Sequence, residues 1–591
     1  MSDSSNPGGP RIETTTDSEG KDQEKTAGAN TPFHPYETAS QIAGESVAEV
    51  GESAGEFPVE QPSIQTDRST GRSAFFVGAG ILISRIVGLI RQRVFAHYFG
   101  TSAAGDAFSA AFRIPNFLQN VFGEGALSAS FIPVYARLLA QKDEKQAQYI
   151  ANAIFGLLAL VTSLAVLLGV LTAPYLVKVI APGFIDERRE LTIRLVQIFF
   201  PGAGLLVLSA WCLGVLNSHH RFFISYTAPV AWNVAIITAL IVFGTRVDQF
   251  RLAEVTAWGS VIGSALQFAV QLPTVLQLVQ RFRPVIDLAS VHVRTVVRSF
   301  FPVFISRGVV QISAFVDEAI ASFLGHGAVV ALNYAQSLYT LPVSLFGMAV
   351  SAAELPAMSR AIGKSEVVFQ TLRERLNAGL RRIAFFIVPS AMAFLALGDI
   401  IAGALYQTGR FGRTDAVYVW AILAGSTVGL LGATLGRLYS STYYALQDTR
   451  TPLKYAIVHV TLSTVLGYLS AIYIPRALNI DQKWGVAFLT TSAGVAAFVE
   501  FSLLRRTLNG RIGRTGLRFG YVVILWSSAV AGAAVGWALK LFVAGLHPIP
   551  LAMLILGAYG VTYFAITSAV GLPESLSVIH RVLRIFRIRR I

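Results

Sequence analysis

Residues 73–99 decide the fold of this chain, and their sequence is SAFFVGAGILISRIVGLIRQRVFAHYF. A helix of that length rises about 40 Å, which exceeds the ~30 Å of hydrocarbon in a bilayer. The stretch is mainly apolar, yet it contains Arg85, Arg91, Arg93 and His97. A charge at bilayer depth is costly unless it faces water or a partner, so these side chains indicate a hydrated cavity or an ion-pair network.

Apolar runs of similar length recur along the rest of the chain. Of its 591 residues, 53% are hydrophobic and 14% are charged, whereas soluble domains carry about 25% charged residues. This composition excludes a water-soluble enzyme, and no strand-length stretch alternates between apolar and polar residues as a membrane barrel requires. The sequence therefore predicts an all-α, polytopic membrane protein with about fourteen transmembrane helices. They are expected near 73–99, 106–139, 149–175, 187–217, 222–244, 253–280, 297–324, 328–359, 370–398, 415–445, 453–475, 484–504, 519–544 and 549–571.

Lys and Arg are concentrated in alternate loops. The set that includes 137–145, 281–294 and 505–514 is rich in them, and the opposite set contains few. Because cytoplasmic loops carry the excess of Lys and Arg, we expect the first set and both termini to be cytoplasmic. An even number of spans requires the same placement of the termini.

The net charge of +14 combines two opposite regions. Residues 1–72 contain thirteen acids and five bases, a net of −8, so the rest of the chain carries +22 (14 + 8). A basic membrane body favours an anionic lipid surface or an anionic lipid substrate over nucleic acid. Residues 1–72 lack a long apolar run, and we expect a disordered cytoplasmic tail, with partner binding by 31–37 as the alternative.

A weak internal repeat divides the spans into two sets. Ile83-Ser84-Arg85 recurs as Ile305-Ser306-Arg307, and three further pairs follow in order at similar offsets. Six spans per repeat is an even number, so both halves enter the membrane with the same polarity, a recurrent transporter plan with a central cavity between two parallel six-helix lobes. We expect an N-terminal lobe at 73–284, a C-terminal lobe at 285–510, two additional helices at 511–575 and a basic cytoplasmic tail at 576–591.

Further charged residues interrupt the second and seventh spans. Two explanations are open for them and for the arginines of the first span: ion pairs that lock helices together, or a hydrated, net-basic cavity for an anionic substrate. For Asp317 and Glu318 the alternatives are salt-bridge partners and a cation-coupling site. The candidate cavity residues are Arg85, Arg91, Asp106, Arg113, Glu124 and Arg307.

No residue pattern indicates covalent chemistry or a metal site. The single cysteine, Cys212, excludes an internal disulfide and a cysteine-based metal cluster. The nine histidines show no metal-ligand spacing. We therefore expect no cofactor, no metal and no catalytic residue.

Several motifs are similar to those of one family of lipid transporters. They include 84–91 (SRIVGLIR), Asp106-Ala107-Phe108, 112–116 (FRIPN), Glu124-Gly125-Ala126, 181–184 (APGF) and 447–452 (QDTRTP). In order along the chain these motifs resemble those of the MurJ (MviN-type) lipid II flippases of the multidrug/oligosaccharidyl-lipid/polysaccharide exporter superfamily, and the resemblance covers about 73–575. It implies a fourteen-helix protein of the bacterial inner membrane that moves lipid II from the inner to the outer leaflet.

The resemblance also implies roles for individual residues. Two positions depart from the family, because Gln119 and Ser337 stand where it has arginines. Our hypothesis is that Arg307, which the repeat places opposite Arg85, compensates for the lost cations. Four charged residues match the family's functional cavity positions: Arg85, Arg91, Asp106 and Glu124.

The expected function is alternating-access transport of lipid II, an undecaprenyl-pyrophosphate-linked disaccharide-peptide, for cell-wall synthesis; the protein would not be an enzyme. Arg85 and Arg91 would pair with the pyrophosphate, since a guanidinium matches phosphate oxygens bidentately. The expected partners are lipid II, membrane lipids and the cell-wall synthesis machinery. The alternatives are an exporter of another undecaprenyl-linked polysaccharide intermediate, a cation-coupled drug antiporter, a membrane-embedded glycosyltransferase or polymerase, and a structural scaffold.

Overall fold

Helices make up the regular structure of this computed structural model, apart from an isolated β-bridge within the described residues. The all-α prediction is confirmed. Residues 68–591 form one unit, separate from residues 1–67. The predictions for the N-terminal tail, Gln119 and Glu124 lie outside the described residues, which are 68–118, 126–359, 365–543 and 545–588.

The helix boundaries follow the predicted spans closely. In chain order the helices are α2 (Arg68–Phe99), α3 (Ala103–Leu118), α4 (Ser128–Ala140), α5 (Glu144–Ile180), α6 (Asp186–Ser218), α7 (Phe222–Phe243), α8 (Gln249–Val279), α9 (Val291–Ala321), α10 (Ala328–Pro342), the π-helix η2 (Val343–Met348), α11 (Ala349–Ser359), α12 (Ser365–Tyr406), α13 (Arg413–Ala445), α14 (Arg450–Ala477), the 3₁₀ turn η3 (Gln482–Trp484), α15 (Gly485–Ile512), α16 (Phe519–Phe542), α17 (Pro548–Ala569) and α18 (Pro573–Ile588).

Eleven helical segments in the described ranges are long and apolar enough to cross a membrane. The chain is therefore a multi-pass membrane protein. The predicted spans at 73–99, 106–139 and 297–324 are not among the eleven. They are the spans with the interrupting charges, and the second is divided between α3 and α4. The count of fourteen therefore stays a prediction.

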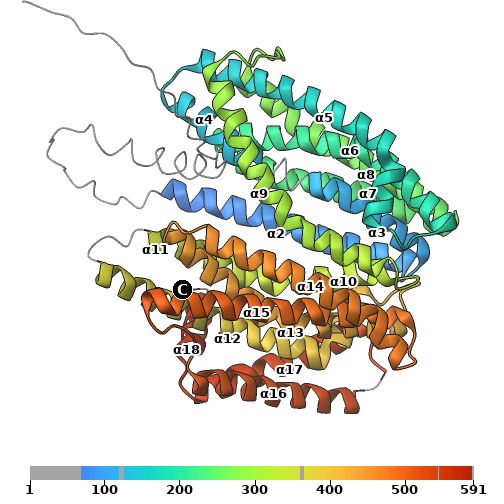
Figure 1. The fold of residues 1–591 in the computed structure, drawn as a ribbon, viewed down its shortest axis with the longest axis vertical. Coiled ribbons are helices and arrows are strands. Elements are labelled where there is room, and N and C mark those ends of the chain that lie inside the picture. The colour runs from blue at the N-terminus through green and yellow to red at the C-terminus, as the bar shows by residue number, and fades with distance from the viewer. Residues whose placement is uncertain (1–67, 119–125, 360–364, 544, 589–591) are drawn as a thin grey trace, which may run out of the picture. The chain divides into compact units, whose positions relative to one another are not determined.

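Two groups of helices pack around separate central helices. In the first group, α6 contacts α3, α5 and α8, while α7 contacts α2 and α8. In the second group, α13 contacts α10, α12 and α15, and α14 packs on α15. Helices α16 and α17 pack on α12 at the outside of the second group (Figure 1).

Helix α9 belongs to neither group alone. It contacts α4 and α5 of the first group as well as α14 and α15 of the second. Figure 1 shows it crossing from one group to the other. The predicted lobe boundary at 284/285 therefore precedes a helix that bridges the groups.

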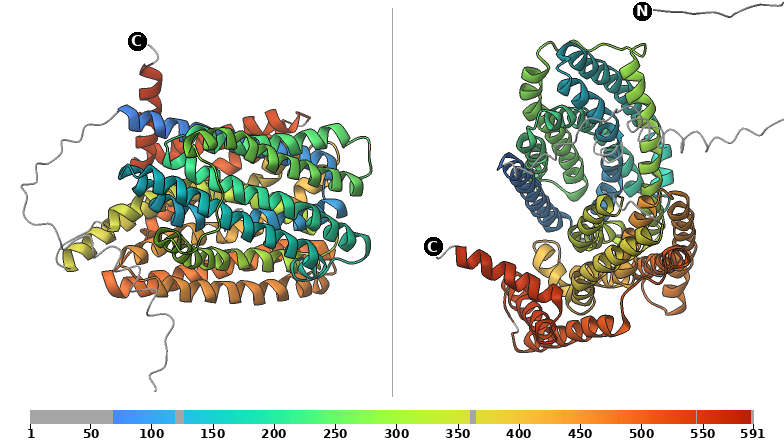
Figure 2. Two further views of the ribbon diagram at one scale, coloured as in Figure 1. Left: turned by 90° about the horizontal axis from the view of Figure 1, so that it is seen from above. Right: turned by 90° about the vertical axis from the view of Figure 1, so that its left-hand side faces the viewer.

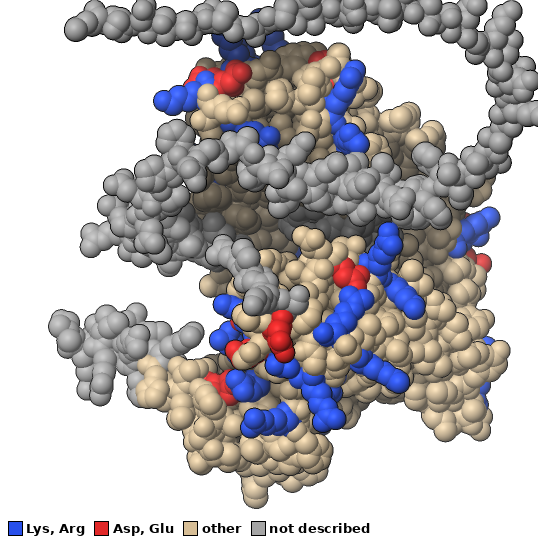
Figure 3. Space-filling view, turned by 60° about the vertical axis from the view of Figure 1, so that its left-hand side comes forward, with Lys and Arg blue, Asp and Glu red and all other residues tan. Residues whose placement is uncertain are grey.

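The two ends of the helix bundle differ in charge. We call one end the basic end, formed by loops 141–143, 280–290, 446–449 and 513–518, which include Lys142 and Arg281. Figure 3 brings this side of the molecule forward, and Lys and Arg outnumber Asp and Glu on the visible face. The opposite loops form the sealed end, which is described below.

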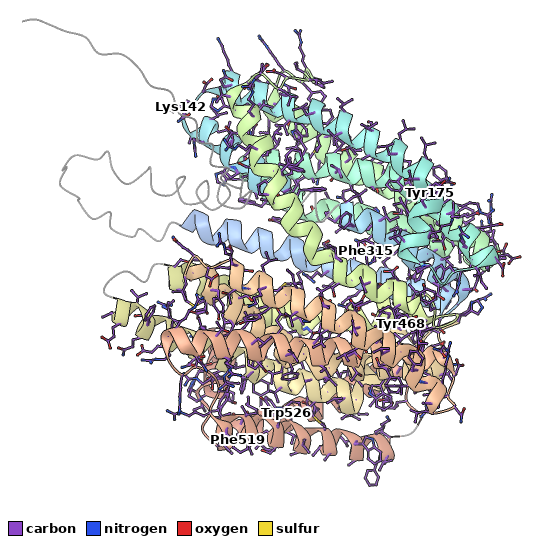
Figure 4. The ribbon with its side chains drawn as sticks, in the orientation of Figure 1. Lys142, Tyr175, Phe315, Tyr468, Phe519 and Trp526 are labelled. Atoms are coloured by element: carbon purple, nitrogen blue, oxygen red, sulfur yellow. The ribbon has the colours of Figure 1, made fainter. Side chains whose placement is uncertain are left out.

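Many large apolar side chains point away from the bundle. On α5, Leu171, Tyr175 and Val179 are 66%, 69% and 74% exposed, and Figure 4 shows Tyr175 on the outer surface. Water would disfavour such a continuous apolar surface, whereas lipid chains cover it without cost. The same surface explains why hydropathy alone locates most of the helices.

Candidate substrate cavity

A pocket of about 330 Å³ lies between α2 and α10, where the two helix groups face each other. Its wall on α2 consists of Arg85, Gly88, Leu89, Arg91 and Gln92, and its wall on α10 consists of Asn333, Gln336, Ser337, Thr340 and Leu341.

The helical repeat explains why these residues share a pocket. Positions 85, 88, 89 and 92 are spaced by three, four and seven residues, which places them on one face of a helix. Positions 333, 336, 337, 340 and 341 follow the same rule on α10. Two polar stripes on otherwise apolar helices thus face each other.

Arg85 and Gly88 form the open part of the α2 wall. Arg85 is exposed even though it lies near the middle of α2. A Cβ atom added to Gly88 would meet nothing within 4 Å, so this glycine faces space rather than a packed neighbour. Together they place a cationic group beside an open part of the pocket wall that carries no side chain.

Arg91 is held by aromatic rings of the first helix group. Its guanidinium lies 5.2 Å from the ring centre of Phe112 and 5.3 Å from that of Trp232. The two rings are stacked on each other, 5.5 Å apart and almost parallel. Cation–π contacts of this kind fix the position of a guanidinium without neutralising its charge.

Ser337 takes part in a direct contact across the pocket. The Gln92 side-chain amide donates a hydrogen bond to the Ser337 hydroxyl at 3.1 Å. That hydroxyl in turn donates to the carbonyl of Asn333. The α10 wall is therefore neutral and rich in amides, and the positive charge of the pocket comes from α2.

Asp317 and Glu318 of the seventh span are not among the residues that line this pocket. Glu318 is fully buried and forms an ion pair with Arg113 at 2.8 Å. Asp317 is half-buried. Arg307 lies on α9, but its side chain is outside the described residues, so its position relative to Arg85 stays a prediction. Arg113 thus pairs with the carboxylate of Glu318 and is not among the residues that line the pocket.

Asp106 lies at the start of α3 and caps a helix of the opposite group. Its carboxylate accepts hydrogen bonds from the backbone N–H of Gly327 at 2.6 Å and of Val330 at 2.9 Å. These are among the first N–H groups of α10, which has no side-chain cap of its own. An acidic group at a helix N-terminus is favourable because it satisfies free N–H donors and the helix dipole. Asp106 therefore does not line the pocket.

Arg188 completes this contact from α6. Its guanidinium lies 3.3 Å from the Asp106 carboxylate and donates to the carbonyls of Gly325 and Gly183. It also lies over the ring of Phe184, 4.1 Å from the centre. One arginine on α6 thus contacts α3 and two loops at this end of the bundle.

The last turns of α2 are tied to the other group as well. Arg93 donates to the carbonyls of Ala404 and Leu405 at 2.7 and 3.0 Å. The ring of His97 hydrogen-bonds with Thr408 at 2.8 Å. We call this end the sealed end; it consists of loops 100–102, 181–185, 322–327 and 407–412.

Two glycines allow the backbones to meet at the sealed end. A Cβ on Gly327, which has φ +82°, would lie 2.5 Å from the carbonyl oxygen of Thr101. A Cβ on Gly183 would lie 2.4 Å from the carbonyl oxygen of Ser322. Any larger residue would separate the two groups. The pocket at Arg85 lies about 22 Å from Gly100 along α2, on the side toward the basic end.

Sequence reasoning missed several of these residues. Arg188 was not among the candidate residues, and the signal that could have indicated a role is its position four residues after the 181–184 motif (APGF). Gln92, Asn333 and Gln336 carry no charge, but the three-and-four spacing on their helices was a usable signal. In the described residues no group of three or more His, Cys, Asp and Glu could hold a metal ion.

Comparison with known proteins identifies the family. The family profile described as lipid II flippase MurJ matches residues 95–565. The chain belongs to the MurJ family. A probable lipid II flippase MurJ of Rhizobium tropici is 31% identical over 472 residues, covering 78% of this chain and 85% of that protein. The lipid II flippase MurJ of Burkholderia cenocepacia is also 31% identical, covering 73% of this chain and 82% of its own length.

Solved structures agree with the MurJ fold. A lipid II flippase MurJ in an inward closed conformation superimposes with a TM-score of 0.69 at 23% identity, covering 84% of this chain and 98% of that one. An inward-facing multidrug resistance MATE family transporter of the MOP superfamily gives a TM-score of 0.57 at 14% identity, covering 74% and 98%. At these identities the likeness concerns the fold alone.

Proposed function

We propose that this chain is a lipid II flippase of the bacterial inner membrane that works by alternating access and catalyses no covalent reaction. Its substrates and neighbours are lipid II and membrane lipids. The observation that carries the proposal is the pocket between the helix groups, in which Arg85 is exposed and Arg91 is held by two rings. The family names of its relatives support the same substrate.

Substrate binding uses the asymmetry of the two walls. Arg85 and Arg91 pair with the pyrophosphate, because guanidinium groups match phosphate oxygens in charge and geometry. The amides of Asn333 and Gln336 on the opposite wall hydrogen-bond the sugar and peptide, whose groups are largely neutral donors and acceptors. The prenyl chain stays in the lipid outside the pocket.

Translocation requires the sealed end to open. The pocket lies on the side of the sealed end that faces the basic end, and we assign the basic end to the cytoplasm together with both termini on the basis of its Lys and Arg content. The opposite state breaks the hydrogen bonds between Asp106 and α10 and closes the basic end. Helix α9, which contacts both groups, is the element about which they rotate.

Ion coupling is a separate part of the proposal. Glu318 is paired with Arg113, which favours the salt-bridge explanation for that residue. Asp317 is half-buried beside this pair and is the better candidate for a coupled cation. Replacing Asp317 with Asn tests this, because it removes the charge and keeps the shape.

Complementation of a strain depleted of its own lipid II flippase tests the main proposal. The wild-type chain should restore growth, and Arg85→Ala should not, at equal protein levels in the membrane. Lys145→Ala is the matched control, since it removes one exposed cation at the basic end and should leave growth intact. Purified protein in liposomes containing lipid II should give the same order of activities.

One observation favours a second candidate, an exporter of another undecaprenyl-linked polysaccharide intermediate. Ser337 leaves the α10 wall without the family's cation, so a substrate with a less charged head group is also compatible with it. Failure to rescue despite normal expression, together with transport of a different polyprenyl-linked sugar, would favour this exporter over the flippase.

A further inference from the structure

The first turn of α18 is fixed to the helix bundle, at the basic end of the bundle. The hydroxyl of Ser575 is fully buried and bonds with that of Ser568 at 2.6 Å. Glu574 forms an ion pair with Arg381 of α12 at 3.6 Å. The first turn of α18 therefore has a defined direction, set by contacts with α17 and α12.

The depth of α18 relative to the membrane follows from the two helices before it. α17 has 22 residues, about 33 Å at the helical rise, and α18 begins four residues after it ends. Phe519 and Phe542 are 84% and 86% exposed at the two ends of α16, and Figure 4 shows Phe519 at the basic end. Aromatic residues are enriched at membrane interfaces, so α18 starts where the hydrocarbon ends.

The direction of α18 is across the spans. Both views of Figure 2 show it running at a steep angle to α16 and α17 instead of continuing along them. A helix that leaves a span at the interface and turns across it lies in the plane of the membrane surface. The contacts that hold it to the rest of the protein include those of Glu574 and Ser575 in its first turn, next to α17 and α12.

The sequence of α18 is strongly amphipathic. At about 100° per residue, positions 576, 579, 582, 583 and 586 fall on one side, and all of them are Leu, Ile, Val or Phe. Arg581 and Arg584 fall on the opposite side, and Arg587 lies at the border between the two sides. The only acid of the helix is Glu574, which already has Arg381 as its partner. By sequence, the bases of α18 therefore outnumber its acids, which suits an anionic surface.

We propose that α18 lies on the membrane leaflet at the basic end and that its three arginines bind anionic phospholipid head groups. The apolar side enters the boundary between head groups and acyl chains, and the guanidinium groups pair with lipid phosphates. A charged lipid surface strengthens binding about fivefold for each arginine near it, so three arginines contribute about a hundredfold.

A single-cysteine fluorescence experiment on the full-length chain tests this inference. The buried Cys212 is replaced with Ala, and an environment-sensitive fluorophore is attached at Val582→Cys on the apolar side or Ser577→Cys on the polar side. The protein is placed in nanodiscs of phosphatidylcholine alone or mixed equally with phosphatidylglycerol. The label at 582 should shift to the blue in the mixed lipid and be quenched by lipid-bound quenchers, while the label at 577 stays in water.

The charge variant Arg581→Gln/Arg584→Gln/Arg587→Gln should lose most of the shift at 582. The control Arg137→Gln/Lys142→Gln/Lys145→Gln removes three exposed cations near the start of α5 and should keep it. Raising the salt concentration should reduce the shift in the unaltered helix, a measurement that needs no charge variant. Equal emission from both labels, or no dependence on phosphatidylglycerol, would overturn the proposal.

Discussion

Arg113 on α3 and Glu318 on α9 form an ion pair of 2.8 Å that connects the first helix group to the bridging helix. The carboxylate of Glu318 is fully buried, and the guanidinium of Arg113 is 20% exposed and lies 5.6 Å from the ring centre of Phe315. Since α9 also contacts α14 and α15, this pair lets a movement of α3 reach the second group.

Removing one partner of this pair should destabilise the protein strongly. Arg113→Ala leaves Glu318 as a buried, uncompensated carboxylate, and we expect a loss of about 3–5 kcal/mol in unfolding free energy. The double variant Arg113→Gln/Glu318→Gln should recover much of that loss. Thermal unfolding in one detergent measures both; equal losses in the single and double variants would contradict a buried pair.

Two substitutions of Gly88 should have different effects on stability and on transport. Gly88→Ala meets no neighbour and removes a helix-interior glycine, so unfolding should become harder by about 0.5–1 kcal/mol with transport retained. Gly88→Leu fills the pocket beside Arg85 and should abolish flipping while the protein stays folded. Flipping by Gly88→Leu at the wild-type rate in liposomes would show that the substrate passes elsewhere.

A covalent link across the sealed end should stop transport. Thr101 donates a hydrogen bond to Asp415 across the two groups, and cysteines at both positions come within reach of a short bifunctional methanethiosulfonate reagent, which joins them through two reducible disulfides. In a Cys212→Ala background we expect flipping to be lost on crosslinking and restored by reduction. Thr101→Cys alone, treated identically, is the control; continued flipping by the crosslinked protein would rule out opening at this end.

Adding a cation to the α10 wall should strengthen binding of the pyrophosphate. Ser337→Arg adds a charged donor opposite Arg85, and one charged hydrogen bond of about 1.5–3 kcal/mol raises affinity at least tenfold. The gain should shrink at high salt. Ser337→Gln has a similar reach without charge and should show no such gain. The measurement is binding of undecaprenyl pyrophosphate at two salt concentrations.

Asp448 should make stability depend on pH in the acidic range. Burial alone would raise its pKa, but hydrogen bonds from Thr451 and the ion pair with Arg511 at 2.6 Å outweigh burial and lower the pKa. A lowered pKa stabilises the fold above the ordinary value of about 4, and this contribution disappears as the pH falls through the lowered pKa. Unfolding temperatures between pH 6 and pH 3 should therefore fall less steeply in Asp448→Asn than in the wild type.

Hydropathy was sufficient to predict where most of the helices lie, but not which helices contact each other. An apolar run of twenty residues must form a helix in lipid, so boundaries such as those of α7 and α17 were predictable. The bridging position of α9 was not, because hydropathy along a helix does not indicate which other helices it contacts. The repeat suggested two lobes and could not indicate that one helix contacts both.

The candidate site was predictable where charge and helical spacing coincide. Arg85 and Arg91 interrupt an apolar helix, and both line the pocket. The partners of Asp106 lie far away in sequence: Gly327 is 221 residues later. A carboxylate that caps a distant helix has the same local sequence signature as one that faces a cavity, so only the structure distinguishes the two.

Because Asp106 caps α10, the hydrogen bonding of a few amide protons depends on the conformational state of the whole transporter. While the groups are joined, the N–H of Gly327 and of Val330 is held by this carboxylate. When they separate, the first turn of α10 loses those acceptors and frays. Deuterium uptake at this turn thus reports how often the exit is open, without any label on the substrate.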